Sequence, residues 1–325
     1  MTFLLGLLLL STGPAAGDSL LTLDAIIPLA HVNGRIDHMA FDPKRQRIYV
    51  AALGNNSIEI VDLQNRKYID HIKDLNEPQG VAYVPYSDYI VVTNGGDGYV
   101  DFYDAGSFKN VGHVEVGRDA DNIRWDPNLN RLVVGFGEGG LAIIDPRQMR
   151  KTSRVPLPSH PESFQLDPSG HVAFVNLPAT GEIVKVDLEA AKILQHWSTS
   201  PSSNNYPMAL DAAHDCVFVG CRTVTSLVIL NAESGKQQTR TGIASDVDDI
   251  WYDAHTSMMY ASCGAGVLEV FKVVSGAEFQ LLADIKTSPG ARTSIFVPER
   301  NEIIVAAPAT GSTSARLLVY KIALR

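Results

Sequence analysis

An all-β fold built from repeats is predicted for this chain by three observations. Residues 119–145 divide into three short β-type stretches, at 123–126, 131–135 and 141–145, joined by turns that contain Pro127-Asn128 and several glycines. The same pattern returns about every 42 residues along the chain. No stretch of useful length shows the 3.6-residue hydrophobic period of an amphipathic helix.

The repeats align on the residue that closes the first strand of each unit. Successive copies lie 42, 42, 41, 44, 42 and 44 residues apart, at Phe41, Tyr83, Trp125, Leu166, Leu210, Tyr252 and Phe296. Each copy continues into a second strand, a turn with Gly or Asn, and a third strand. A weaker fourth strand follows, as at residues 67–72, 110–116 and 192–197. Seven four-stranded units of this period are typical of a seven-bladed β-propeller.

The two ends of the chain are expected to complete one blade together. The seventh unit stops after its third strand, so its blade lacks an outer strand. Residues 20–30, LLTLDAIIPLA, precede the first unit and have the character of a spare strand. We expect this segment to join the last blade, because ring closure removes an open sheet edge. Residues 18–325 would then form a single propeller domain.

Residues 1–17 have the features of an export signal. They carry no charged side chain and combine an apolar run at residues 3–10 with small residues up to Gly17. This resembles a secretory signal peptide, cleaved near Gly17, and the run is far shorter than the about 20 residues that span a bilayer. No later stretch could cross a membrane. A membrane anchor or a misassigned start is the alternative, because no Lys or Arg precedes the run. We expect a periplasmic or secreted protein.

Charge and cysteine content exclude several classes of function. The formal net charge is −9, with no basic run, which disfavours binding to nucleic acid. The three cysteines include no C-x-x-C-H arrangement, so covalent c-type haem is excluded. Cys221 and Cys263 occupy the same position in adjacent units. They are either a reactive or metal-binding thiol pair, or two small residues that pack in the core.

The repeats resemble a known family. Residues 47–62, RIYVAALGNNSIEIVD, are similar to the YVTN-type β-propeller repeat, and the similarity extends over essentially the whole chain after residue 17. The resemblance implies the fold. It leaves the function open, because propellers include hydrolases, lyases, oxidoreductases and binding modules.

A polar ring is expected at one mouth of the central channel, which the first strands of a propeller line. Four residues before the aligned position stand Asp37, Gln79, Asp121, Glu162, Tyr206, Asp248 and Arg292. The next residues are His38, Gly80, Asn122, Ser163, Pro207, Asp249 and Thr293, and those after them are almost all apolar. We call the first set, with His38, Asn122 and Asp249, the mouth ring.

Converging carboxylates at the mouth ring predict a ligand site. Such groups repel one another, so either a pKa rises or a cation binds. Oxygen ligands suit Ca²⁺ or Mg²⁺, and the candidate metal ligands are Asp37, Asp121, Glu162 and Asp248. His38 could add a nitrogen ligand for a transition metal. The wider candidate binding set is Asp37, Gln79, Asn122, Glu162, Tyr206, Asp248, Asp249 and Arg292.

Simpler interpretations compete with a site. Each acid could instead accept backbone N–H bonds in a turn, and Arg292 could pair with Asp248 or Asp37. His160 could lie near the mouth, although a histidine before proline is more typical of a turn.

Two functions are consistent with such a mouth. The first is binding of a small molecule, a metal ion or a protein partner. The second is a metal-dependent hydrolase or lyase activity on a small lactone-like substrate, with His38, Asp121 and Arg292 as catalytic candidates. The mouth is chemically similar to those of gluconolactonase–regucalcin-type lactonases and streptogramin-B-lyase-type propellers. A haem- or quinone-dependent redox role is less favoured, because no haem ligand stands out. A closed ring also suggests a monomer.

Overall fold

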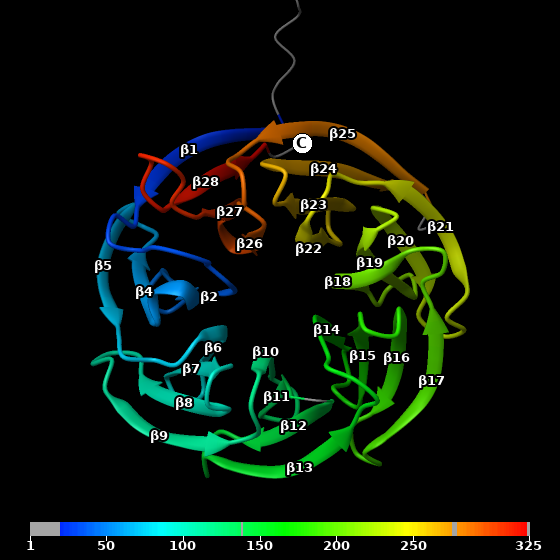
Figure 1. The fold of residues 1–325 in the computed structure, drawn as a ribbon, viewed down its shortest axis with the longest axis horizontal. Helices are drawn as coiled ribbons and strands as arrows, with labels where there is room; N and C mark the ends of the chain where they lie inside the picture. The colour runs from blue at the N-terminus through cyan, green and yellow to red at the C-terminus, as the bar shows by residue number, and fades with distance from the viewer. Residues whose placement is uncertain (1–19, 138, 275–277, 324–325) are drawn as a thin grey trace, which may run out of the picture.

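The chain forms a ring of seven antiparallel sheets. The computed structural model describes residues 20–137, 139–274 and 278–323. Over these residues each sheet has four strands, and the sheets are arranged around a common centre (Figure 1). The first strand of each blade lies innermost and the last forms the outer rim (Figure 1). The predicted seven-bladed β-propeller is therefore confirmed.

The strand boundaries follow the aligned repeats closely. Blades one to three contain β2 (Met39–Asp42), β3 (Arg47–Ala52), β4 (Ser57–Asp62), β5 (Lys67–Ile72), β6 (Pro78–Val84), β7 (Tyr89–Asn94), β8 (Tyr99–Asp104), β9 (Asn110–Glu115), β10 (Ala120–Asp126), β11 (Arg131–Phe136), β12 (Gly140–Asp145) and β13 (Arg150–Pro156). Blades four and five contain β14 (Phe164–Leu166), β15 (Val172–Leu177), β16 (Glu182–Asp187), β17 (Lys192–Ser198), β18 (Ser203–Asp211), β19 (Cys216–Thr223), β20 (Ser226–Asn231) and β21 (Gln237–Gly242). Blades six and seven contain β22 (Val247–Asp253), β23 (Met258–Cys263), β24 (Val267–Val274), β25 (Glu278–Lys286), β26 (Thr293–Val297), β27 (Glu302–Ala307) and β28 (Arg316–Ile322), and short 3₁₀ helices occupy Leu53–Asn55 and Pro298–Arg300.

The N-terminal strand closes the ring as predicted. β1 (Leu21–Pro28) pairs antiparallel with β28 and completes the sheet β1-β28-β27-β26 (Figure 1). An ionic cluster joins this blade to blade one, because the buried Glu302 contacts Arg66 Nη2 at 2.6 Å and Lys321 Nζ at 2.9 Å. The expected signal peptide, residues 1–17, lies outside the described residues.

The hydrophobic core is divided among the contacts between blades. Seven clusters of buried side chains occur in the described chain, and each joins one blade to its neighbour. Alternation along a strand produces this pattern: Val133 packs toward blade four and Val134 toward blade two. The core therefore surrounds the channel and leaves the channel mouth to polar residues. Within the described residues, no helix is long and apolar enough to span a membrane.

Breaks in strand register present the mouth ring to the channel. Ladder pairing is interrupted between Ala120 and Ile123, between Pro78 and Val81, between Asn205 and Met208, and between Val247 and Asp249. Asp121, Gln79, Tyr206 and Asp248 lie inside these interruptions. A break of this kind re-aims side chains that a regular strand would direct into the neighbouring sheets. In the other three blades, Asp37, Glu162 and Arg292 stand just before the first strand.

Candidate functional site

His38 lies among three carboxylates from three blades. Its Nε2 is 3.7 Å from Asp37 Oδ1 and 3.9 Å from Asp121 Oδ1, and its Nδ1 is 3.8 Å from Asp249 Oδ1. These separations are longer than hydrogen bonds. Blades one, three and six therefore meet at this imidazole.

A second histidine joins the acids of blades three and four. Asp121, His160 and Glu162 each offer one potential ligand atom, and these three atoms lie within 4.8 Å of one another. His160 Nε2 is 3.9 Å from Asp121 Oδ2. His160 Nδ1 is 2.9 Å from the carbonyl oxygen of Gly137 and 3.1 Å from Asp119 Oδ2. A proton on Nδ1 satisfies these acceptors and leaves Nε2 free to face Asp121, as in metal-ligating histidines.

Besides Asp37 Oδ2, which lies 2.7 Å from Arg35 Nη2, two buried oxygen atoms of the mouth ring have no hydrogen-bond partner. They are Asp121 Oδ1 and the side-chain oxygen of Asn122, and both residues are at least 95% buried. An unsatisfied buried acceptor destabilises the fold unless a cation, a water or a ligand donor meets it. This second observation points to a bound group at the same place as the triad of Asp121, His160 and Glu162.

The ionisation of the mouth acids differs from one residue to the next. Burial and the neighbouring carboxylates raise the pKa of Glu162 to about 8. Burial raises the pKa of Asp249 to about 7, in spite of His38. Burial alone would also raise the pKa of Asp121, but His160 and His38 hold it below its usual value. Burial opposes protonation of His160, yet Asp121 and Asp119 raise its pKa to about 9. The site thus contains more carboxyl groups than His38 and His160 can pair with.

The opposite side of the mouth is occupied by ion pairs. Arg292 Nε contacts Asp248 Oδ2 at 2.8 Å, and Arg222 also pairs with Asp248. The Arg222 guanidinium in turn lies 3.9 Å from the centre of the Tyr206 ring. Asp248, Arg292 and Tyr206 are therefore engaged with protein partners, which is the simpler interpretation offered above for Arg292.

The remaining ring members also have protein contacts. Arg35 Nη2 lies 2.7 Å from Asp37 Oδ2, and Gln79 Nε2 donates to Asp119 Oδ1 at 3.3 Å. Burial raises the pKa of Asp37 to about 8 despite Arg35. The structure thus separates Asp37 and Asp248, which are held by arginines, from Asp121 and Glu162, which join His160.

A small cavity continues below the mouth ring. Its volume is about 40 Å³, and it is lined by side chains of five innermost strands, including His38, Asp249, Arg124 and Ser294. Ser294 donates its backbone N–H to Asp249 Oδ2 at 2.8 Å. A space of this size accommodates water or an ion rather than an organic substrate.

The cysteines lie in the core. Cys221 and Cys263 are free thiols with no exposed surface, and they belong to clusters between different pairs of blades. Burial raises the pKa of Cys221 to about 11. These properties are those of packed apolar residues and not of a reactive or metal-binding pair.

Three side chains outside the predicted set contribute to the mouth. His160, for which the sequence favours a turn over a place near the mouth, stands two residues before the ring acid Glu162 and lies close to it. Arg35 and Arg222 pair with Asp37 and Asp248. The available signal for His160 was its spacing of two from a ring position, which keeps both residues at the same end of the blade.

Comparison with known proteins supports the fold and no narrower assignment. No protein-family model matches the chain. It is similar to hydrazine synthase of Kuenenia stuttgartiensis, with 14% identity, 88% of this chain and 97% of that chain covered, and a TM-score of 0.77. It is also similar to a chain of the mitotic checkpoint complex, with 12% identity, 99% and 98% covered, and a TM-score of 0.80. These likenesses define the class as a seven-bladed β-propeller.

Proposed function

We propose that this chain is an exported propeller of the YVTN-repeat type that binds a divalent transition metal at its channel mouth. Asp121, His160 and Glu162 would be the protein ligands. The observation that carries the proposal is the approach of their three ligand atoms to within 4.8 Å, beside the unpartnered Asp121 Oδ1. The YVTN assignment is supported by residues 47–62, and export by residues 1–17.

The donor set favours Zn²⁺ or Mn²⁺ over Ca²⁺ or Mg²⁺. An imidazole nitrogen with two carboxylates suits borderline metals, whereas Ca²⁺ prefers oxygen ligands alone. Bonds of about 2.1 Å place neighbouring ligands roughly 3 to 4 Å apart, so a pair at the 4.8 Å limit would close by about 1 to 2 Å. Three protein ligands leave coordination positions for water, a small molecule or an acidic group of a protein partner.

Titration of metal into the protein tests the proposal. Protein stripped with a chelator is expected to bind one Zn²⁺ or Mn²⁺ by calorimetry, and much less Ca²⁺. Glu162→Gln and His160→Asn are each expected to weaken binding by more than about tenfold. His171→Asn is the matched control, because His171 also pairs with an acid, Glu189 at 2.8 Å, but is exposed away from the mouth. Equal metal binding by wild type and both ligand variants would contradict the proposal.

A metal-dependent hydrolase or lyase is a second candidate, and the position of His38 favours it. Its imidazole is 3.9 Å from the proposed ligand Asp121, where it could move a proton to or from a molecule held at the metal. The metal would polarise the carbonyl of a lactone-like substrate. Zinc-dependent hydrolysis of δ-valerolactone that is lost in His38→Gln would support this activity. Zinc binding without hydrolysis of any small lactone would leave metal-dependent binding as the function.

A further inference from the structure

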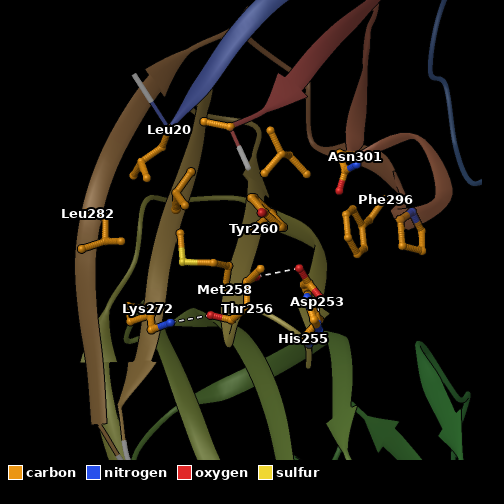
Figure 2. A pocket seen from close by; sticks show the side chains of 14 residues that line it. Leu20, Asp253, His255, Thr256, Met258, Tyr260, Lys272, Leu282, Phe296 and Asn301 are labelled. Atoms are coloured by element: carbon orange, nitrogen blue, oxygen red, sulfur yellow. Dashed lines mark hydrogen bonds between the residues drawn. The ribbon is translucent and has the colours of Figure 1, made fainter. Parts of the chain in front are cut away.

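A second cavity lies between blades six and seven, at the other end of the strands. It has a volume of about 610 Å³ and includes Asp253, the last residue of β22, whereas the mouth acid Asp248 is near the start of that strand. Small-molecule sites in proteins typically measure about 300–1,000 Å³. Most of the lining is apolar (Figure 2): Leu20, Met258, Val270, Leu282, Phe296 and Ile322.

One buried donor in this cavity wall has no partner. Tyr260 has no exposed surface, and its hydroxyl makes no hydrogen bond. Figure 2 shows its ring among the lining side chains, and its centroid is 5.6 Å from that of Phe296. Burial, with the charge of Asp253, raises the pKa of Tyr260 far above its usual value, so the hydroxyl stays protonated and acts as a donor. Leaving such a group unpaired is unfavourable.

Other blades show how this position is ordinarily satisfied. Tyr260 is the third residue of β23, and the third residue of β3 is Tyr49, whose hydroxyl donates to Asp42 at 2.9 Å. The third residues of β15 and β19 are Phe174 and Phe218, which have no hydroxyl. Phe174 even lines a smaller cavity between blades four and five, of about 390 Å³. An unpaired donor beside a cavity therefore distinguishes blade six from these three blades.

Asp253 ends β22 as Asp42 ends β2, but it does not accept a hydrogen bond from Tyr260. Asp253 Oδ2 accepts from Thr256 Oγ1 at 2.6 Å, and Asp253 Oδ1 accepts from the backbone N–H of His255 at 3.0 Å. Lys272, at the same end of the cavity, donates to the backbone carbonyl of Thr256 (Figure 2). None of these polar groups pairs with the Tyr260 hydroxyl, which is left for a ligand.

We propose that the cavity between blades six and seven binds a small, uncharged, mainly apolar molecule. Its carbonyl oxygen displaces the side chains that cover the Tyr260 hydroxyl and accepts a hydrogen bond from it. The apolar lining excludes water from the body of such a ligand and stabilises it by burial. The lining holds one carboxylate, Asp253, and one ammonium, Lys272, so these charges offset each other and favour neither sign of charge on the ligand. The site is separate from the metal site of the proposed function.

Binding of 2-octanone, measured by calorimetry on the full chain, tests this inference. One saturable site is expected, with octanoate binding more weakly because its carboxylate would lose hydration in a mainly apolar cavity. Tyr260→Phe is expected to weaken 2-octanone binding by about three- to tenfold, the equivalent of one neutral hydrogen bond. This variant should fold, because phenylalanine occupies the same position in blades four and five. Leu282→Trp, at the exposed edge of the cavity, is expected to abolish binding by filling it.

Two controls separate this site from other effects. Tyr49→Phe removes the equivalent hydroxyl from blade one and should leave 2-octanone binding unchanged. Removing or adding Zn²⁺ should also leave it unchanged, so failure of the metal proposal would not affect this result. The inference is overturned if 2-octanone does not saturate one site, or if Tyr260→Phe binds it as tightly as wild type.

Discussion

At the scale of single residues, the mouth shows how neighbours decide the state of a carboxyl group. Asp121 and Glu162 hold equivalent positions in adjacent blades, yet the pKa of Asp121 is lowered and that of Glu162 is raised to about 8. Asp121 is buried and Glu162 half-buried, and Asp121 lies beside His38 as well as His160, whereas Glu162 faces mainly other acids. A divalent cation would neutralise these acids at a place where Asp121 Oδ1 has no hydrogen-bond partner.

Metal binding at this site is expected to strengthen as pH rises from 6 to 8. Glu162 must lose a proton at about pH 8 and His160 one at about pH 9 before either can act as a ligand. Stability of the metal-free protein should change in the opposite direction. Raised folded-state pKa values contribute stability below the ordinary values, 4.5 for Glu162 and 6.5 for His160, and this is lost as pH rises through about 8 and 9.

Thermal unfolding with and without Zn²⁺ measures both effects. The melting temperature of the stripped protein should fall between pH 6 and pH 8, and the increase caused by Zn²⁺ should grow over the same range. Glu162→Gln, which cannot ionise, should show a smaller zinc effect at every pH. A zinc-induced increase that is as large at pH 6 as at pH 8 would show that these two groups are not the ligands.

At the scale of secondary-structure elements, two local features position the site. Register breaks in four innermost strands release the ring residues from the ladder and direct them into the channel. The closing strand β1 then keeps blades seven and one adjacent. His38 of blade one therefore stands opposite Asp249 of blade six, because the ring is closed through blade seven.

Two substitutions in β1 test whether its buried face stabilises the closed ring. Ile27 has no exposed surface and packs in the cluster between blades seven and one, whereas its neighbour Ile26 is 52% exposed. Ile27→Ala is expected to lower the free energy of unfolding by about 2–5 kcal/mol, as for other buried large-to-small changes. Ile26→Ala should change it by no more than about 0.5 kcal/mol. Urea denaturation measures both, and equal effects would contradict the role of β1 in ring closure.

At the scale of the whole molecule, the fold places polar and apolar groups in separate zones. Seven clusters between blades stabilise the described ring, and the channel mouth carries the ionisable residues. The apolar, uncharged residues 1–17 precede this arrangement and contribute no repeat. Removal at Gly17 would leave β1, which begins at Leu21, intact for ring closure.

Export with cleavage is therefore expected when the chain is expressed with its own N-terminus. Intact mass measurement of the exported protein should give a chain that begins at Asp18. A Gly17→Pro change at the cleavage position should instead leave a longer, membrane-associated precursor, because the signal is no longer removed. Recovery of the full-length wild-type chain inside the cell, with none exported, would contradict the prediction.

The sequence by itself determined the repeat, the seven blades, the closing strand and the ring positions at the mouth. These follow from local patterns, because strand period, turn residues and a spacing near 42 residues recur in every unit. Only the tertiary structure decided that His160 meets Asp121, that arginines engage Asp37 and Asp248, and that Tyr260 lacks the partner that Tyr49 has. Such contacts depend on side-chain direction and on which blades ring closure brings together, and neither is encoded in any single repeat.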